Sequence, residues 1–454
     1  MSIRLWLHVC GGLSAAAWAA LAVISPHASE PLIPFLLANA SAWLLFGVSW
    51  WLCRQAEKEV SRIVVLWGVA FRLCGFIAQP VLDDDYFRYL WDGRQLGTGA
   101  NPYATAPADH FAGDVGEFEE ILNNVSYPHV RTIYGPLTEV GFALSYWIAP
   151  GKLWPWKLFV ISCDLLLLWL IACLTQTATP LIRRTALLLV AWCPLSIFET
   201  GFNAHADVLG VTLLIAAMFG VRASAGVLNG RLRARQGWVT MSESKRQHIG
   251  AVLCGLAVSA KVFAVLLVPL LLERRFRSWL MFALVVAAMY LPFVFTGTSA
   301  DLQGLLTFAA SWEFNSSLYA VLSNFTGVLA AKFVLGGVFL TVCFAVWLQW
   351  RRDRSLPRGD ILYGALFLCA ATVNPWYLLW MLPFVALRPS VAGLTALAAV
   401  SASYITWFNL GVATGGAFEH PIWVRPIEYG AVLAGAGIDL WRWRRSKAVI
   451  STRA

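Results

Sequence analysis

Apolar runs long enough to cross a bilayer recur along nearly the whole chain. A membrane-spanning helix needs about 20 predominantly apolar residues. Runs of this kind lie at 5–24, 32–53, 62–82, 158–176, 278–296, 327–350, 391–410 and 425–441. Because a helix pairs its backbone groups within a single segment, the pattern predicts an all-α polytopic integral membrane protein. We expect about 12–14 transmembrane helices, several of them short and paired.

Three further apolar stretches, 186–222, 249–273 and 360–388, lie between basic segments. Basic connections favour the cytoplasmic side, so both ends of each stretch should lie there. Each stretch is then predicted to be a pair of short helices whose tip faces the opposite side. The polar residues at these tips are Glu199 to Asp207, Lys261, and Asn374 to Tyr377.

The charge balance supports this orientation. The chain has 34 Lys and Arg against 25 Asp and Glu, a formal charge of +9. In a soluble protein this excess could indicate nucleic-acid binding, but here the basic residues lie in short connections between apolar runs. We therefore predict no nucleic-acid partner, and a first run that is retained as a helix rather than removed as a signal peptide.

These patterns divide the chain into six parts. They are N-terminal transmembrane helices (1–82), an extracytoplasmic loop with an acidic motif and a surface helix (83–133), transmembrane helices with a basic cytoplasmic loop at 222–247 (134–296), a second extracytoplasmic loop (297–325), C-terminal transmembrane helices (326–441) and a basic cytoplasmic tail (442–454). Residues 134–150 do not fit the number of membrane crossings that the assigned sides of the connections require. Either they dip into the membrane and return, or one connection is assigned to the wrong side.

The acidic motif DDDYFRYLWDGR, at 83–94, has helical spacing. Asp85, Arg88 or Tyr89, and Asp92 share one face, and the aromatic residues around Trp91 share the other. This pattern predicts an amphipathic helix that lies on the membrane surface with its aromatic face on lipid. The alternative is a solvated helix cap, with negative charge at the positive end of the helix dipole.

Carboxylates and cations are expected together on the outer face. A carboxylate can take a proton from a hydroxyl nucleophile, and a cation can stabilise a departing phosphate. Lys261 stands inside an apolar run, where an ionisable residue is a functional candidate by default, although it could also snorkel to the interface. The chain has no nucleotide-binding signature, so this chemistry suits a sugar phosphate on a lipid already dissolved in the bilayer.

Seven stretches resemble the GT-C glycosyltransferases, and more closely the catalytic subunit of GPI mannosyltransferase I and its prokaryotic relatives. They are LDDDYFRYLWDG (82–93), IYGPLTEVGFALSY (133–146), KLFVISCDLLLLWL (157–170), CPLSIFETGFNAHADVL (193–209), LAVSAKVFAVLLVPLL (256–271), SWEFNSSLYAVL (311–322) and NPWYLLWMLPF (374–384). The resemblance implies an inverting transfer of a hexose, commonly mannose, from a polyprenyl-phosphate donor to a hydroxyl of a lipid or glycan acceptor.

The resemblance also implies roles for particular residues. The family's motif has two acids flanking one residue, whereas all three positions are acidic here. Asp84 or Asp85 is therefore expected to be the base, and Asp83 to orient the surface helix. Lys261 is the first candidate for the donor phosphate, followed by Arg131 and Arg88. The residues expected to line the sugar or acceptor pocket are Asp92, Glu199, His205, Asp207, Glu313, Asn315 and Trp376.

The expected location is the bacterial inner (plasma) membrane, with the active site on its extracytoplasmic face. No metal-binding spacing such as H-E-x-x-H is present, so no metal is assigned. A divalent cation between Asp83 and Asp85 is an alternative that the chemistry does not require. An accessory subunit leaves no sign in the sequence. The alternative function is a transporter or flippase for a lipid-linked sugar, although such a protein should show two related halves and none is seen.

Overall fold

The computed structural model describes residues 2–27, 31–222, 242–272, 275–295, 303–353, 356–407, 409–410 and 418–451. Most of the expected basic loop at 222–247 lies outside these residues. Arg274 and Arg354, which belong to two other basic segments between apolar stretches, also lie outside them. The described residues form helices, turns and one isolated bridge between Phe314 and Thr372, with no named strand. The predicted all-α class is therefore confirmed.

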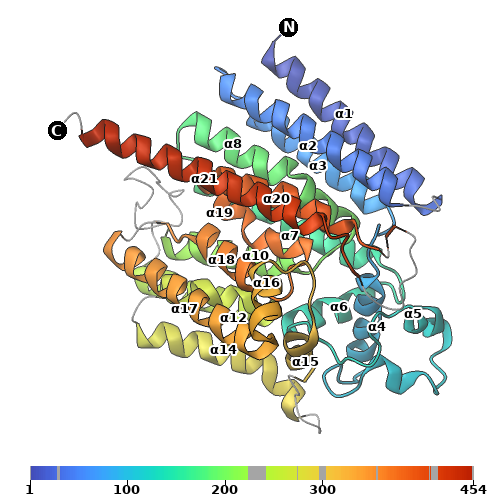
Figure 1. Ribbon diagram of the computed structural model, residues 1–454. Helices are drawn as coiled ribbons and strands as arrows, with labels where there is room; N and C mark the ends of the chain where they lie inside the picture. Colours follow the sequence, from blue (N-terminus) through green and yellow to red (C-terminus); the bar gives the residue numbers. More distant parts are fainter. Residues whose placement is uncertain are drawn as a thin grey trace. The chain divides into compact units, whose positions relative to one another are not determined.

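Helices of very different lengths follow one another along the chain, from single turns to the 28 residues of α21 (Figure 1). The α-helices are α1 (Ile3–Ile24), α2 (Leu32–Gln55), α3 (Ser61–Ile77), α4 (Asp85–Gly97), α5 (Glu119–Asn123), α6 (Pro136–Ile148), α7 (Trp154–Leu174), α8 (Pro180–Trp192), α9 (Pro194–Ser196), α10 (Asp207–Arg222), α12 (Glu243–Ala260), α13 (Val268–Leu271), α14 (Phe276–Phe295), α15 (Gln303–Ser311), α16 (Leu318–Thr326), α17 (Val328–Asp353), α18 (Gly359–Cys369), α19 (Leu382–Leu387), α20 (Val391–Ala399) and α21 (Val424–Ser451). The 3₁₀ turns are η1 (Ser25–His27), η2 (Pro107–His110), η3 (Gly116–Phe118), η5 (Val262–Leu267), η6 (Pro375–Trp380) and η7 (Val400–Tyr404), and η4 (Ile197–Phe202) is a π-helical turn.

The chain divides into two compact units. Unit 1 comprises Met1–Trp67, Thr179–Ser196 and Glu313–Ala454, and unit 2 comprises Gly68–Ala178 and Ile197–Trp312. Within unit 1, α1 packs on α2 and α20 packs on α21. Within unit 2, α4 packs on α6, and α12 packs on both α10 and α14. The acidic motif belongs to unit 2.

Six helical segments among the described residues are long and apolar enough to cross a membrane. They are Ile3–His27, Leu32–Gln55, Trp154–Leu174, Pro180–Phe202, Phe276–Val294 and Val328–Asp353. Four shorter apolar helices accompany them: Asp207–Val221, Val262–Leu271, Gly359–Cys369 and Val391–Tyr404. These segments confirm a polytopic membrane protein, and the total of about 12–14 spans stays a prediction.

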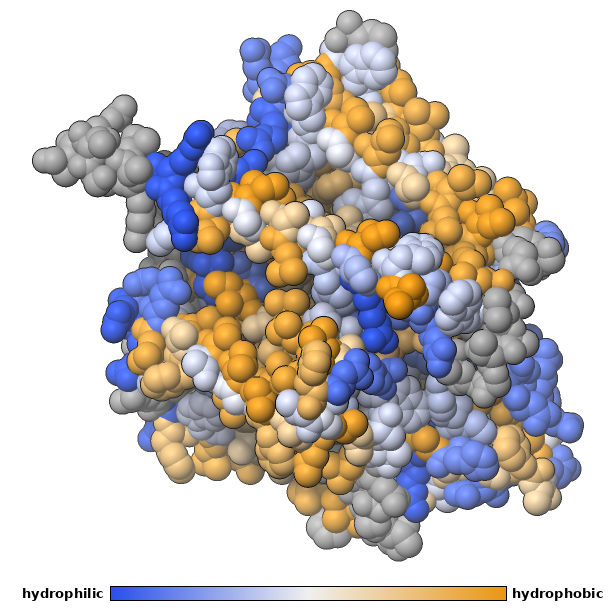
Figure 2. All heavy atoms as spheres, viewed as in Figure 1, coloured by the Kyte–Doolittle hydropathy of each residue, from blue (hydrophilic) through white to orange (hydrophobic). Residues whose placement is uncertain are grey.

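The helix surfaces agree with this assignment. Apolar side chains cover much of the face seen in Figure 2. On α14 and α17, Phe276 is 78% exposed and Phe333 is 74% exposed. Soluble monomers rarely expose large contiguous apolar surfaces, whereas helices that face lipid do so by necessity.

The three stretches predicted as paired short helices are each interrupted where their polar residues lie. The first is interrupted between the π turn η4 and α10, the second at Lys261 after α12, and the third between α18 and η6. These interruptions are confirmed. Within the segment predicted as the second extracytoplasmic loop, 297–325, the described residues include the short helix α15 and most of α16. The side of the membrane on which this segment lies stays a prediction.

The amphipathic helix of the acidic motif forms as α4, but its aromatic face does not rest on lipid. Trp91 is 0% exposed and belongs to a buried cluster completed by Phe118, Ile121, Leu122 and Val125. The expectation of a lipid-facing surface is therefore wrong. The segment that follows α4 carries enough apolar side chains to cover this face itself, and burial there removes it from any solvent.

Helix α6 lies within residues 134–150, the segment that does not fit the predicted membrane topology. It has 13 residues, which corresponds to about 20 Å, well short of the about 30 Å hydrocarbon core. It packs against α4 so closely that a Cβ added at Gly93 would lie 2.6 Å from the carbonyl oxygen of Phe142. Helix α6 by itself is therefore shorter than a complete span, and the path of residues 134–150 stays a prediction.

Candidate active site

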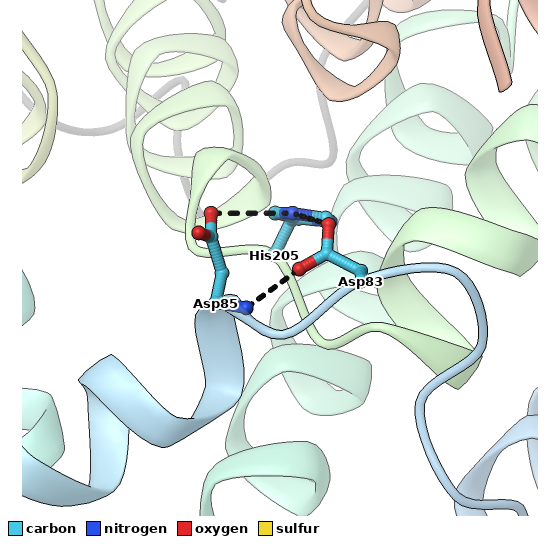
Figure 3. A group of neighbouring side chains, drawn as sticks. All are labelled: Asp83, Asp85 and His205. Carbon is cyan, nitrogen blue, oxygen red and sulfur yellow. Dashed lines mark hydrogen bonds and ion pairs between the residues drawn. The ribbon is translucent and has the colours of Figure 1, made fainter. Parts of the chain in front are cut away.

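Two of the three consecutive acids face a histidine from a distant part of the chain (Figure 3). Asp83 lies in the turn before α4, Asp85 is the first residue of α4, and His205 lies between η4 and α10. His205 Nε2 is 3.1 Å from Asp83 Oδ2 and 3.8 Å from Asp85 Oδ2. The Asp85 backbone N–H donates to Asp83 Oδ1 at 2.8 Å, which orients the first carboxylate.

The other ring nitrogen of His205 faces a second carboxylate. Nδ1 lies 2.7 Å from Glu199 Oε2, and the imidazole is 1% exposed. A neutral imidazole has a single N–H, so carboxylates at both nitrogens favour the doubly protonated ring. Burial lowers the pKa of His205, but the negative charges of Asp83 and Glu199 outweigh it and raise the pKa well above its ordinary value. We call Asp83, Asp85, Glu199 and His205 the Asp–His cluster.

The backbone that carries this cluster adopts strained conformations. Leu82, directly before Asp83, has φ 60°, and Ala204, directly before His205, has φ 58°. Non-glycine residues rarely adopt this left-handed region, and such strain often marks functional sites. The carbonyl of Ala204 is held by Trp156 Nε1 at 2.8 Å. The surrounding structure therefore imposes the turn that presents His205.

Asp85 has the surroundings of a group that can exchange protons near neutrality. Its side chain is 32% exposed, yet the surrounding protein desolvates the carboxyl group. This desolvation, with the negative charge of Asp83, raises the pKa of Asp85 to about 7. The Tyr134 hydroxyl donates to Asp85 Oδ2 at a long 3.4 Å. A carboxylate with such a pKa is suited to general base catalysis.

Asp84 differs from its neighbours because it faces another segment. Its Oδ2 accepts a hydrogen bond from the Ser126 hydroxyl at 2.5 Å. Burial raises its pKa, while the bond from Ser126 opposes that shift. Asp84 therefore ties the start of α4 to the segment around Ser126, whereas Asp83 and Asp85 face His205.

Lys261 lies near the ring of Tyr134, whose hydroxyl contacts Asp85. Its Nζ is 3.2 Å from Asp207 Oδ2 and 5.5 Å from the centroid of the Tyr134 ring. Lys261 directly follows Ala260, the last residue of α12, and its backbone is extended, so its side chain comes from the interruption rather than from a regular helix. Tyr134 thus contacts both a carboxylate and a cation, Asp85 through its hydroxyl and Lys261 through its ring.

A buried polar network holds the π turn that carries Glu199. Arg72 Nε lies 2.7 Å from Asp164 Oδ2, and the Thr200 hydroxyl donates to the same oxygen at 2.9 Å. Nearby, Lys157 Nζ donates to the carbonyls of Gly75 and Ala78 at 2.6 and 2.7 Å. These contacts connect α7 to the end of α3 and to η4. They therefore position both segments that lead into the Asp–His cluster.

The side chains of Asp83, Asp85 and His205 could also hold a divalent cation. One ligand atom from each lies within 4.8 Å of the others. Glu199 at Nδ1 would then orient the histidine, as outer carboxylates do at metal sites. The contacts at both ring nitrogens favour the imidazolium instead, and a protonated nitrogen cannot bind a metal.

We expect the chelator EDTA to leave turnover and the unfolding temperature of the protein unchanged. The imidazolium of His205 already supplies the positive charge between the carboxylates. Turnover measured with EDTA, and then with added Mn²⁺ or Mg²⁺, checks this. Loss of activity that either metal restores would instead assign Asp83, Asp85 and His205 as ligands.

Two of the predicted site residues, Arg88 and Asp92, form an ion pair with each other. Arg88 Nε lies 2.8 Å from each Asp92 oxygen, and Arg88 Nη1 donates to the carbonyl of Val130. Asp92 is 0% exposed. Spacing of four residues on a helix makes them neighbours, and a buried carboxylate needs such a partner. Arg88 and Asp92 therefore form an internal ion pair, and the expected phosphate role of Arg88 and pocket role of Asp92 stay predictions.

The remaining candidates are divided between the units. Arg131 is half-buried in unit 2, three residues before Tyr134. Glu313, Asn315 and Trp376 belong to unit 1, where Asn315 is buried and Trp376 packs beside Tyr377. Of the predicted residues, unit 2 brings together Asp83, Asp85, Glu199, His205, Asp207 and Lys261.

The sequence did not predict that Tyr134 and Ser126 contact the acidic motif, or that Arg72, Lys157 and Asp164 form a buried network that supports the site. The network had a signal, because charged residues inside apolar runs are functional or structural candidates by default. Tyr134 had a weaker one, since it lies within the quoted IYGP stretch. Ser126 had none, because its role depends on a contact across the loop.

The helices define this chain as a polytopic membrane protein. Comparison with protein families matches residues 12–275 to the family described as alpha-(1->6)-mannopyranosyltransferase, N-terminal domain. The chain belongs to this family and is a GT-C-type mannosyltransferase, so the predicted class of enzyme is confirmed. The comparison with curated proteins and the comparison with solved structures each gave no match.

Proposed function

We propose that this enzyme transfers mannose from a polyprenyl-phosphate donor to a hydroxyl of a lipid or glycan acceptor, forming an α-(1→6) linkage. The linkage follows from the family description, and the donor from the apolar helices beside a charged site. We place the reaction on the extracytoplasmic face, opposite the basic connections. A single inversion gives an α-linked product only from a β-linked donor phosphate.

The observation that carries the proposal is the arrangement of Asp85 and Lys261 around Tyr134. Asp85 Oδ2 is 3.4 Å from the Tyr134 hydroxyl, and Lys261 Nζ is 5.5 Å from its ring centroid. A carboxylate with a pKa of about 7 and an ammonium group thus lie against one side chain. Inverting transfer from a lipid phosphate needs these two functions at neighbouring positions.

In the proposed step, the Asp85 carboxylate takes the proton of the acceptor hydroxyl. The hydroxyl oxygen bonds to the anomeric carbon as the bond from that carbon to the phosphate oxygen breaks. The bonding electrons leave with the polyprenyl phosphate, whose new negative charge Lys261 stabilises. Arg131, in the same unit, is the second candidate for this anion. His205 holds Asp83, and through it the backbone of Asp85, in place.

The alternative role of lipid-sugar transporter is less well supported. Membership of a mannosyltransferase family favours chemistry at the acidic motif over passage of an intact lipid. If the protein in vesicles moved a labelled lipid-linked sugar across the bilayer and formed no transfer product, the transporter alternative would be favoured.

Replacing Lys261 with methionine should raise the KM for polyprenyl-phosphate mannose by about 10- to 100-fold, because a charge-assisted contact to the phosphate is lost. The measurement is transfer of labelled mannose by the full chain in lipid nanodiscs. The matched control is Lys152→Met, since Lys152 is an exposed lysine in the turn before α7. Equal donor KM values for the two variants would remove Lys261 from the phosphate site.

The pH profile should report the titration of Asp85. Protonation as the pH falls through about 7 removes the base, so kcat/KM should fall about tenfold per unit below that value and level off above it. The charged groups facing Asp85 are Asp83, Asp84, His205 and Lys261. Initial rates in a constant-ionic-strength buffer series check this. A flat profile between about pH 5 and 8 would exclude Asp85 as a base with this pKa.

A further inference from the structure

A pair of carboxyl groups lies buried in unit 2, where α4 packs on α6. Asp92 belongs to α4 and Glu139 to the first turn of α6, and both residues are 0% exposed. The two carboxyl groups are hydrogen-bonding neighbours. The proposed transfer step does not involve Glu139, so a fully buried acid beside another acid calls for an explanation.

The two carboxyl groups have different partners. Asp92 accepts from Arg88, whose Nε is 2.8 Å from each of its oxygens. Glu139 Oε1 accepts from the Thr132 hydroxyl at 2.6 Å, whereas its Oε2 is buried without a hydrogen-bond donor among the described residues. Within the same described part of the chain, the cation Arg88 forms its ion pair with Asp92, and Glu139 forms none.

One proton must be shared by these two carboxyl groups. Two carboxylates in contact repel each other, and their removal from water makes a second negative charge more costly. Arg88 neutralises only one charge, on Asp92. The dipole of α6 favours a negative charge in its first turn, but this effect is smaller than the repulsion between two buried carboxylates. The proton therefore belongs to Glu139, on Oε2, because Oε1 accepts from Thr132.

Hydrogen bonds link the neutral Glu139 to the backbone of Tyr134. The Thr132 hydroxyl donates to Glu139 and accepts from the Tyr134 N–H at 3.2 Å. The Tyr103 hydroxyl donates to the Tyr134 carbonyl at 2.7 Å, and its ring also faces Glu139. Both backbone polar groups of Tyr134 are therefore held by side chains that surround the acid pair.

The same stretch of chain also lies against the end of α12. The Thr138 hydroxyl donates to the carbonyl of Ala260, directly before Lys261, at 3.0 Å. Gly135 packs so closely that an added Cβ would collide with a carbonyl oxygen in the last turn of that helix. The segment that contains Tyr134 is therefore fixed to the backbone that presents Lys261.

We propose that Glu139 is a positioning residue of the transfer reaction, which holds Tyr134 in place as a neutral acid bonded to Asp92. Glu139 is fully buried, so it acts through Tyr134 rather than on the substrates. The inference rests on the proposed function for the roles of the base and the lysine that Tyr134 contacts. The charged and titratable groups that face Glu139 are Arg88, Asp92 and Tyr103.

Two variants distinguish a neutral Glu139 from a charged one. Glu139→Gln keeps both hydrogen bonds, because its amide N–H donates to Asp92 and its amide oxygen accepts from Thr132. Glu139→Met has a similar size and makes neither bond. In initial rates of mannosyl transfer by the full chain in lipid nanodiscs, Glu139→Met should lose at least about tenfold in kcat, and Glu139→Gln should recover most of that loss.

The matched control is Glu120→Gln, which changes an exposed carboxylate of α5 and should behave as wild type. Gel filtration and thermal unfolding check the fold of each variant. If Glu139→Met does not fold, Thr132→Val takes its place, because it removes only the hydroxyl that joins Glu139 to Tyr134. It should show the same loss of kcat.

Infrared spectroscopy tests the proton on Glu139 without any donor or turnover. A neutral carboxylic acid has a carbonyl stretch at a frequency distinct from those of carboxylates and amides. The spectra of Asp85→Asn and of Asp85→Asn/Glu139→Gln are compared at neutral pH, so that Asp85 does not contribute. We expect the acid band in the first protein and its loss in the second.

Equal transfer rates for Glu139→Gln and a folded Glu139→Met, or the absence of the acid band from the infrared difference, would overturn the proposal. The failure of the proposed function would look different. The acid band of Glu139 would then be present, while wild type transferred mannose from no polyprenyl-phosphate donor. The neutral acid pair would stand in that case, and the donor chemistry assigned to Asp85 and Lys261 would be lost.

Discussion

Asp85→Asn should reduce mannosyl transfer by about 100- to 10,000-fold, the range typical for loss of a general base. Asparagine keeps the shape of the side chain and cannot accept the hydroxyl proton. The contact from the Tyr134 hydroxyl and the start of α4 at this position should both survive. The measurement is the initial rate of transfer from polyprenyl-phosphate mannose at saturating donor, with folding checked by gel filtration.

Two matched variants make this result interpretable. Asp84→Asn should lose much less activity, because Asp84 binds Ser126 rather than facing His205. Glu117→Gln changes an exposed carboxylate in the same loop and should behave as wild type. If Asp84→Asn were the inactive variant and Asp85→Asn the active one, the base would be assigned to the wrong acid.

Arg72→Met should lower the free energy of unfolding by about 3–5 kcal/mol, the usual cost of removing one partner of a buried ion pair. Arg72 and Asp164 have side-chain exposures of 1% and 0%, so the carboxylate would be left buried without the cation that Arg72 supplies. Equilibrium unfolding in mixed micelles measures the change. Because Thr200 lies in the π turn that carries Glu199, activity should also fall.

The double variant Arg72→Met/Asp164→Leu is the control for this interpretation. Replacing both charges with apolar side chains of similar size often restores stability, since no charge is then left without a partner. Arg62→Met, at an exposed arginine of the same helix, should be nearly neutral. Equal destabilisation by the single and double variants would show that packing rather than charge pairing matters at this position.

The helix α4 shows how far local pattern carries a prediction. Spacing along 83–94 predicts a helix with two faces, and α4 has them. It cannot say what covers each face. Trp91 is covered by residues around Leu122, and the other face packs on α6, where Tyr89 stacks on Phe142. Both partners come from later in the chain, so periodicity within the helix contains no information about them.

The acidic motif shows the same limit for chemistry. The three consecutive acids are all aspartates, so their side chains are identical. The family resemblance could not show whether Asp84 or Asp85 is the base. Their surroundings differ because Ser126 approaches one and His205 approaches the others. The pKa of about 7 for Asp85 depends on desolvation and on the neighbouring charge of Asp83, and desolvation exists only in the folded chain.

The sequence by itself determined the membrane-spanning, all-helical class, the interruptions at Lys261 and between Phe202 and Asp207, and the kind of residues available for catalysis. These properties follow from local composition, because hydrophobic length and helix-breaking residues act within a single segment. Only the tertiary structure decided that His205 lies between Glu199 and Asp83, and that Ser126 donates a hydrogen bond to Asp84. Hydrogen bonds and charge pairs act over a few ångströms, and the fold alone determines which distant residues come within that range.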